Sequence, residues 1–266
     1  MPSYVIVGAS RGIGYQFLKT LSKQDPSNIV IGLARSPADV EAKVAADNLK
    51  NVHILHGDMD SAASLNDAAK KSAGLTGGVV DYLVVNGAYF AMPTLLMSAD
   101  EYVGKEDLFI EEMNKSMQTN VAGTLFAFNA FLPLVLKSSV KRVAAITSAA
   151  ADRNYIFEGE DIRSIHYSIS KGALNILVAK FAARYKNDGV VFASISPGFV
   201  ATHDDVPKEF MDKVAAPLFR FDKALKGPLT PEQSVEACLK VLANISKEQS
   251  GDFLSQWGNK VWLTEK

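Results

Sequence analysis

Short runs of apolar, often β-branched residues alternate along this chain with longer segments in which apolar residues recur three and four positions apart. The short runs predict strands at Tyr4–Val7, Asn28–Leu33, Val52–His56, Val79–Val85, Arg142–Thr147, Val190–Ser196 and Asp252–Trp257. The longer segments predict helices at Gly12–Lys23, Pro37–Asn48, Ser61–Ser72, about Glu106–Leu136 and Ser164–Tyr185, and a further helix that begins near Thr230.

The strands mostly lack a polar alternate face, which predicts burial on both sides. Strands that alternate with helices in this way indicate a doubly wound, Rossmann-type α/β fold, with a parallel sheet between two helical layers. No repeat or linker divides the chain, so we expect residues 1–266 to form one domain. The least regular stretch, about residues 199–228, predicts a substrate flap that contains a helix or two.

Composition narrows the possible functions. The chain has 266 residues, of which 48% are hydrophobic, and its formal net charge of −1 gives no electrostatic footprint for nucleic acid or an anionic membrane. No run approaches the roughly 20 apolar residues of a membrane span, and no signal peptide is visible, so we expect a cytoplasmic protein. The single cysteine, Cys238, excludes an intramolecular disulfide, and with no Cys or His cluster we expect no metal site.

A glycine-rich turn joins the first strand to the first helix. It contains Gly8, Ser10, Arg11, Gly12, Ile13 and Gly14. Glycine lets the backbone approach a pyrophosphate closely, and the helix N-terminus presents free N–H groups to it. The position between strand and helix favours dinucleotide binding over a purely structural turn.

The end of the second strand predicts which dinucleotide binds. An acidic residue there would bind a ribose 2′-hydroxyl, but this chain has Ala34, followed by Arg35 and Ser36. Arg11 and Arg35 can surround a 2′-phosphate, which predicts NADP(H) rather than NAD(H). The alternative is that both are solvated surface arginines.

Two further strand ends carry candidate cofactor contacts. Asp58 and Met59 follow the third strand, where a carboxylate could bind the adenine amino group. Asp58 is alternatively an exposed loop residue or the N-cap of the next helix. Asn86, Gly87 and Ala88 follow the fourth strand and are small enough for a cofactor ribose to lie against them, although they also suit a plain turn.

The candidate catalytic residues are Ser148, Tyr167 and Lys171. Tyr167 and Lys171 are four residues apart and therefore share one face of a helix. Carbonyl reduction needs an acid to protonate the forming alkoxide, and a nearby ammonium would lower the pKa of the phenol toward neutrality. Ser148, at the end of the fifth strand, can donate a hydrogen bond to the substrate oxygen.

Two other polar residues lie near these three. Asn120 lies inside the predicted helix from Glu106, where asparagine is unfavourable, so it either bends the helix and holds a water that relays protons to Lys171 or is a buried interhelical asparagine. His166 precedes Tyr167, but a neighbouring helical residue points about 100° away. We therefore assign His166 at most to the lining of the substrate pocket.

Together these motifs resemble the short-chain dehydrogenase/reductase family over nearly the whole chain. The matching positions are Gly8–Gly14, Asp58, Asn86, Gly87, Ala88, Asn120, Ser148, Tyr167, Lys171, Pro197, Gly198, Thr202 and the tail Gly251–Leu254. The resemblance implies a seven-stranded parallel sheet, a catalytic tetrad of Asn120, Ser148, Tyr167 and Lys171, and pro-S hydride transfer. It also implies cofactor contacts at Tyr167, Lys171, Pro197, Gly198, Val200 and Thr202, and a homodimer or homotetramer.

One motif departs from the family pattern. Family members usually have Asn-Ala-Gly where this chain has Asn86, Gly87 and Ala88. The exchange keeps the residues small but changes the backbone behind the expected nicotinamide.

The sequence therefore predicts an NADP(H)-dependent oxidoreductase that reduces a small ketone or aldehyde, or oxidises the corresponding alcohol. The apolar segments 89–96, 149–157 and 199–221 predict a moderately apolar substrate. The alternatives are a repurposed NADP-binding isomerase or cyclase, and a non-catalytic NADPH sensor or scaffold.

Overall fold

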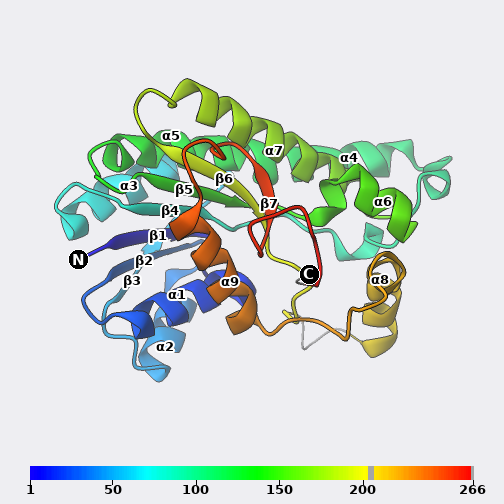
Figure 1. Cartoon of the computed structure of the whole chain (residues 1–266), viewed down its shortest axis with the longest axis horizontal. Helices are drawn as coiled ribbons and strands as arrows, with labels where there is room; N and C mark the ends of the chain where they lie inside the picture. The colour runs from blue at the N-terminus through cyan, green and yellow to red at the C-terminus, as the bar shows by residue number, and fades with distance from the viewer. Residues whose placement is uncertain (203–206, 265–266) are drawn as a thin grey trace.

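The computed structural model describes residues 1–202 and 207–264 and contains one seven-stranded parallel sheet (Figure 1). The strands are β1 (Ser3–Val7), β2 (Ile29–Ala34), β3 (Val52–His56), β4 (Tyr82–Val85), β5 (Arg142–Ile146), β6 (Val191–Ser196) and β7 (Phe253–Ser255). Their order is β3-β2-β1-β4-β5-β6-β7, and Val7 pairs with Leu33 on one side and Val85 on the other. The predicted doubly wound α/β fold is confirmed. The chain reverses its direction of strand addition between β1 and β4, where folds of this class bind ligands.

Helices cover both faces of the sheet (Figure 1). Helices α1 (Gly12–Gln24), α2 (Pro37–Ala46) and α9 (Pro231–Asn244) pack on one face, and α3 (Ala62–Thr76), α5 (Gly123–Val135) and α7 (Ile165–Arg184) on the other. Successive β1 residues enter opposite cores, Val5 and Val7 on the α5 side and Ile6 on the α1 side. This alternation follows from strand geometry and explains why the strands are apolar throughout.

Local signals fix the helix boundaries. The Thr230 hydroxyl accepts a hydrogen bond from the backbone N–H of Gln233, and the Gln233 side-chain oxygen accepts one from the backbone N–H of Thr230. Helix α9 therefore begins with a complete capping box, with Pro231 in its first turn. Gly77 ends α3 in the left-handed conformation, with φ at 65°. The predicted end of that helix at Ser72 is therefore one turn early.

The predicted helix Glu106–Leu136 is helical along nearly its whole length, but it is not a regular α-helix throughout. It divides into α4 (Glu106–Ser116), a π-helical turn at Met117–Ala122 and α5. Asn120 lies in the π turn and is fully buried. Apolar periodicity does not report this break, because the residues before and after it are both helical.

The flap region contains α8 (Lys208–Phe221), and residues 203–206 of the predicted flap lie outside the described residues. An isolated bridge pairs Val200 with Leu229 at the base of the flap. Beneath α8 is a third apolar cluster, in which Trp262 and Leu263 from the C-terminal segment pack with Ala149 and Tyr155. Tyr155 belongs to a short helix that was not predicted, α6 (Arg153–Gly159). Part of the predicted pocket lining is therefore packing under the flap.

Within the described residues, no helix is long and apolar enough to cross a membrane.

Candidate functional site

The glycine turn after β1 is packed too closely for any larger residue. Gly8 has a φ of 81° and donates its N–H to the Leu33 carbonyl, which ties the turn to the end of β2. A Cβ atom on Gly14 would lie 2.0 Å from the Gly8 carbonyl oxygen. The Asn86 side chain donates to that same oxygen at 3.0 Å. The turn therefore holds the ends of β1, β2 and β4 together at the N-terminus of α1, as a cradle for a pyrophosphate requires.

Four exposed polar side chains flank this cradle at the ends of β1 and β2: Ser10, Arg11, Arg35 and Ser36. Among the described ion pairs, no carboxylate neutralises either arginine. The sequence analysis missed a third cation, because Lys43 on α2 extends back to the turn and donates to the Ser10 carbonyl at 3.2 Å. A lysine in the last helical turn is ordinarily explained by the helix dipole, so it gave no signal. Unpaired cations at this position fit a phosphate group.

Asp58 and Met59 lie beside the cradle, at the end of β3. The Asp58 carboxylate accepts from the backbone N–H of Asp60 at 3.1 Å, and Ser61 rather than Asp58 caps α3. The helix-cap alternative for Asp58 is therefore wrong. Met59 is buried, and its sulfur lies 2.4 Å from the point where a Cβ atom on Gly87 would stand. The glycine in the Asn86-Gly87-Ala88 motif thus accommodates the Met59 thioether.

We expect Gly87→Ala to lower the free energy of unfolding by about 1–3 kcal/mol, because the added methyl group overlaps the Met59 sulfur. Met59→Val removes that sulfur, so the double variant Met59→Val/Gly87→Ala should recover much of the loss. Urea denaturation of the four proteins measures the coupling. Strictly additive losses would show that Met59 does not dictate the glycine.

Ser148, Tyr167 and Lys171 come together where β5 ends and α7 begins. Ser148 forms a hydrogen bond with the Tyr167 hydroxyl. Lys171 is 2% exposed, and its ammonium donates to the Ile146 carbonyl at 2.8 Å and lies 5.6 Å from the centroid of the Tyr167 ring. Phe90 meets the same ring edge to face at 5.1 Å. Three of the four predicted catalytic side chains therefore form one cluster at the carboxyl end of the sheet.

The ionisation of this cluster differs from the sequence prediction in one respect. Burial raises the pKa of the Tyr167 hydroxyl to about 12, and the hydrogen bond with Ser148 opposes the rise. Burial also lowers the pKa of Lys171 from 10.5 to about 8. Desolvation disfavours the charged form of each group, and in the protein alone it outweighs the expected lowering of the phenol pKa by Lys171. At neutral pH the Tyr167 phenol therefore keeps its proton, and Lys171 is still mostly a charged ammonium.

Asn120 is held by contacts on both sides of its amide. Its Oδ1 accepts from the backbone N–H of Tyr89 at 2.6 Å, and its Nδ2 donates to the hydroxyl of Ser170 at 2.9 Å. The side chain thus joins the π turn to the loop after β4 and to α7. These contacts fit the alternative in which Asn120 is a buried interhelical asparagine.

His166 does not line a substrate pocket, which corrects the sequence prediction. Its ring is fully buried between the hydroxyls of Thr94 at 2.9 Å and Ser116 at 3.0 Å. Burial lowers the pKa of this imidazole, so it is neutral at neutral pH.

The segment after β6 lies beside the glycine turn. The Pro197 carbonyl accepts from the Ser234 hydroxyl at 2.7 Å, and the Thr202 side chain lies 3.4 Å from the point where a Cβ atom on Gly12 would stand. Gly198 has a φ of 83°, and the buried Gln256 side chain fills the space beside it. Gln256 was not predicted as a neighbour of this segment.

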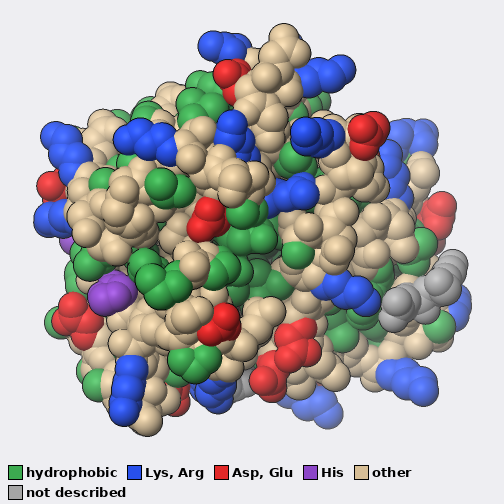
Figure 2. Space-filling model, turned by 60° about the vertical axis from the view of Figure 1, so that its left-hand side comes forward, with side chains coloured by type: hydrophobic (Ala, Val, Ile, Leu, Met, Phe, Trp, Pro, Cys, Tyr) green, Lys and Arg blue, Asp and Glu red, His purple; other side chains and the backbone are tan. Residues whose placement is uncertain are grey.

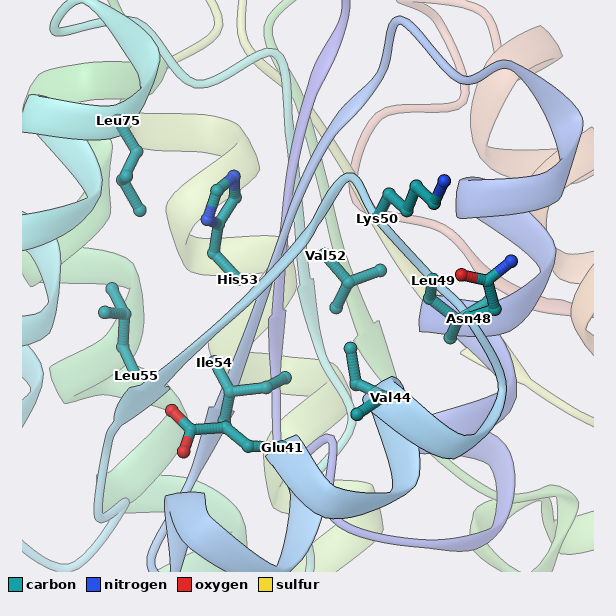
Figure 3. A pocket seen from close by; sticks show the side chains of 11 residues that line it. Glu41, Val44, Asn48, Leu49, Lys50, Val52, His53, Ile54, Leu55 and Leu75 are labelled. Carbon is teal, nitrogen blue, oxygen red and sulfur yellow. The ribbon is translucent and has the colours of Figure 1, made fainter.

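Asn120, Ser148, Tyr167 and Lys171 line neither of two hollows on the described surface. One, of about 450 Å³, surrounds the edge strand β3, with Leu75 of α3 and Val44 of α2 among its lining residues (Figure 3). The other, of about 650 Å³, lies between Leu96 and α8. Figure 2 shows a face on which cationic and anionic side chains are interspersed rather than separated by sign. Within the described residues, no group of His, Cys, Asp and Glu side chains could hold a metal ion.

Comparison with known proteins gives the same assignment at the family level. A family model described as short chain dehydrogenase matches residues 3–210. Short chain dehydrogenase virK of Hypocrea virens is 40% identical over 272 residues, covering 99% of this chain and all of that protein. Short-chain dehydrogenase/reductase iacC of Pestalotiopsis fici is 42% identical over 283 residues, with 99% and 100% covered.

Solved structures share the fold. The NADPH-bound carbonyl reductase from chicken fatty liver superposes with a TM-score of 0.75 at 24% identity, covering 97% of this chain and 98% of that chain. The carbonyl reductase Sniffer of D. melanogaster superposes with a TM-score of 0.75 at 22% identity, with the same coverage. The family model, the curated relatives and the sheet topology agree, and the chain belongs to the short-chain dehydrogenase/reductase family.

Proposed function

We propose that this protein is an NADPH-dependent reductase of a small, moderately apolar ketone or aldehyde. The observation that carries the proposal is the cluster of Ser148, Tyr167 and Lys171 at the carboxyl end of β5, on the same edge of the sheet as the glycine cradle. Parallel α/β sheets bind ligands at this edge. A dinucleotide held by the cradle and these three side chains can therefore act on the same substrate.

Each residue has a distinct role in this proposal. The turn Gly8–Gly14 would hold the pyrophosphate, and Arg11, Arg35 and Lys43 would bind the 2′-phosphate. A bound NADPH supplies the hydride. Ser148 donates a hydrogen bond that orients the substrate oxygen, and Tyr167 gives the proton that completes the alcohol.

The protonation state of Tyr167 suits carbonyl reduction. A phenol with a pKa of about 12 keeps its proton at neutral pH, which suits a general acid, whereas alcohol oxidation needs the phenolate as a base. The Lys171 ammonium stabilises the phenolate that remains after proton transfer, because it is buried close to the ring.

A pH dependence follows from the lowered pKa of Lys171. The ammonium loses its charge as pH rises through about 8, while the Tyr167 phenol remains protonated. We therefore expect kcat for carbonyl reduction at saturating NADPH to fall with rising pH from about 8. Steady-state kinetics at saturating NADPH across this range provide the measurement. A flat profile well above this pKa would show that the Lys171 charge is not required.

The relatives support an oxidoreductase, and two observations support NADPH in particular. The chicken fatty liver carbonyl reductase is described as NADPH-bound. In this chain, the end of β2 has no carboxylate at Ala34 to repel a 2′-phosphate, and the two neighbouring arginines are exposed. These residues fit the phosphate that distinguishes NADPH from NADH.

The direct test measures NADPH absorbance with a panel of aliphatic and aromatic ketones and aldehydes. A reductase consumes NADPH with at least one of them and forms the matching alcohol in equal amount. A sensor or scaffold would bind NADPH without consuming it. An isomerase or cyclase would convert its substrate with no net change in NADPH, and either result would overturn the proposal.

A further inference from the structure

The segment Arg163–His166 leads directly into Tyr167 and contacts two structures that flank the candidate active site. One is the loop Tyr89–Ser98, called here the substrate loop, which begins at the Asn120 contact. The other is α8 of the flap. The hollow of about 650 Å³ lies between them. Its lining is half apolar and half charged: Leu96, Ile162, Ala216 and Pro217, and Glu160, Arg163, Lys213 and Arg220.

His166 fixes the substrate loop through a defined tautomer. Thr94 donates its hydroxyl proton to the Ala91 carbonyl at 3.3 Å, so at 2.9 Å it accepts a hydrogen bond from the Nε2–H of His166. The Nδ1 atom then carries no proton and accepts from the Ser116 hydroxyl at 3.0 Å. One neutral imidazole therefore joins the loop, α4 and the first turn of α7.

Two more contacts hold the loop along its length. The Ser164 hydroxyl donates to the Leu95 carbonyl at 2.8 Å, and Ser98 forms an antiparallel bridge with Arg163. Ser164 adopts a left-handed backbone with φ at 54°, which costs energy for a residue with a side chain. Contacts on both sides of Ser164 offset that cost.

Arg163 holds α8 by donating to a backbone carbonyl that has no donor within the helix. Pro217 lies inside α8 and has no N–H, so the Lys213 carbonyl has no donor one turn later. The Arg163 guanidinium donates to the Lys213 carbonyl and, at 3.2 Å, to the Val214 carbonyl. Asp161 orients the guanidinium from the other side at 3.4 Å.

We propose that His166 and Arg163 are positioning residues, which hold the substrate loop and α8 in place beside the helix that carries Tyr167 and thereby set the affinity for the carbonyl substrate. The inference rests on the proposed reductase function. It assigns to residues outside the tetrad the control of substrate affinity, because between them they contact the loop and α8 but neither the cradle nor the Tyr167 hydroxyl.

Hydrogen exchange and kinetics test the two contacts separately. Thr94→Val keeps the side-chain shape and removes the His166 contact, and Arg163→Met removes the α8 contact. Thr76→Val is the matched control, because it removes a hydroxyl that donates within α3 to the Ser72 carbonyl. We expect amide exchange to quicken by about fivefold or more in residues 89–98 for Thr94→Val and in residues 208–221 for Arg163→Met, as loss of one hydrogen bond allows.

The kinetic readout is a split between KM and kcat. With 4-nitrobenzaldehyde or the best substrate of the carbonyl panel, both variants should raise KM by about fivefold or more, with kcat and the NADPH Kd close to wild type. Pro217→Ala gives α8 its missing N–H, so in that background Arg163→Met should have a much smaller effect on exchange. An equal loosening of α8 by Arg163→Met in both backgrounds would show that this contact does not hold the helix.

The outcomes separate this inference from the function it rests on. Unchanged exchange in both segments, or a raised KM without faster exchange, overturns the positioning role. If wild-type protein reduces no carbonyl of the panel, the reductase proposal fails, and the exchange rates still decide whether these two residues hold the loop and α8.

Discussion

Replacing Tyr167 with phenylalanine is expected to lower kcat for carbonyl reduction by about 10²–10⁴-fold, the usual contribution of a positioned general acid. The substitution removes only the hydroxyl, which carries the transferred proton and the hydrogen bond with Ser148. The aromatic ring and its edge-to-face contact with Phe90 stay in place. NADPH affinity, measured by fluorescence titration, should therefore remain close to wild type.

Tyr155→Phe is the matched control. Tyr155 is also buried and also has a pKa raised by burial, but it packs under α8 beside Phe221. Its phenylalanine variant should retain nearly full kcat. If Tyr167→Phe kept its activity, or if both variants lost it equally, Tyr167 would not be the proton donor.

Replacing Arg35 with alanine is expected to raise the NADPH Kd by about 10- to 100-fold, because a hydrogen bond to a charged group contributes about 1.5–3 kcal/mol. The NADH Kd should change far less, since NADH lacks the 2′-phosphate. Lys43→Gln should weaken NADPH binding in the same sense but by less, and salt should diminish its effect because the ammonium is exposed.

Arg184→Ala provides the control for a general change in charge. Arg184 is exposed at the end of α7 and pairs with Asp188. Its loss should leave both Kd values unchanged. An equal weakening of NADPH and NADH in Arg35→Ala would contradict the phosphate assignment, although the family membership would stand.

The sheet was predictable because its signals are local. Each strand of a doubly wound sheet is apolar on both faces, so seven short apolar runs indicate seven strands. Gly8, Gly14 and Asn86 were also identifiable, because a cofactor cradle requires small residues at strand ends. The Tyr167–Lys171 spacing placed both side chains on one helical face, and the structure brings them to the end of β5 as expected.

The remaining features depend on contacts between distant segments. His166 meets partners 72 and 50 positions away, so nothing in its neighbourhood distinguished a buried structural imidazole from a pocket residue. Lys43 approaches the phosphate cradle only because α2 folds back over the turn. The Met59 sulfur leaves no room for a methyl group at position 87, which accounts for glycine where the family usually has alanine. The sequence of the motif alone does not reveal this contact.

The π turn at Met117–Ala122 accommodates one residue more than an α-helical turn of similar rise. Each residue of a regular helix rotates the next by roughly 100°, so the extra residue sets the side chains of α4 out of phase with those of α5. Deleting one residue there would allow an uninterrupted helix whose two halves could no longer both face their present partners. The extra residue thus lets one long helix serve two packing surfaces and still direct the Asn120 amide at the loop after β4.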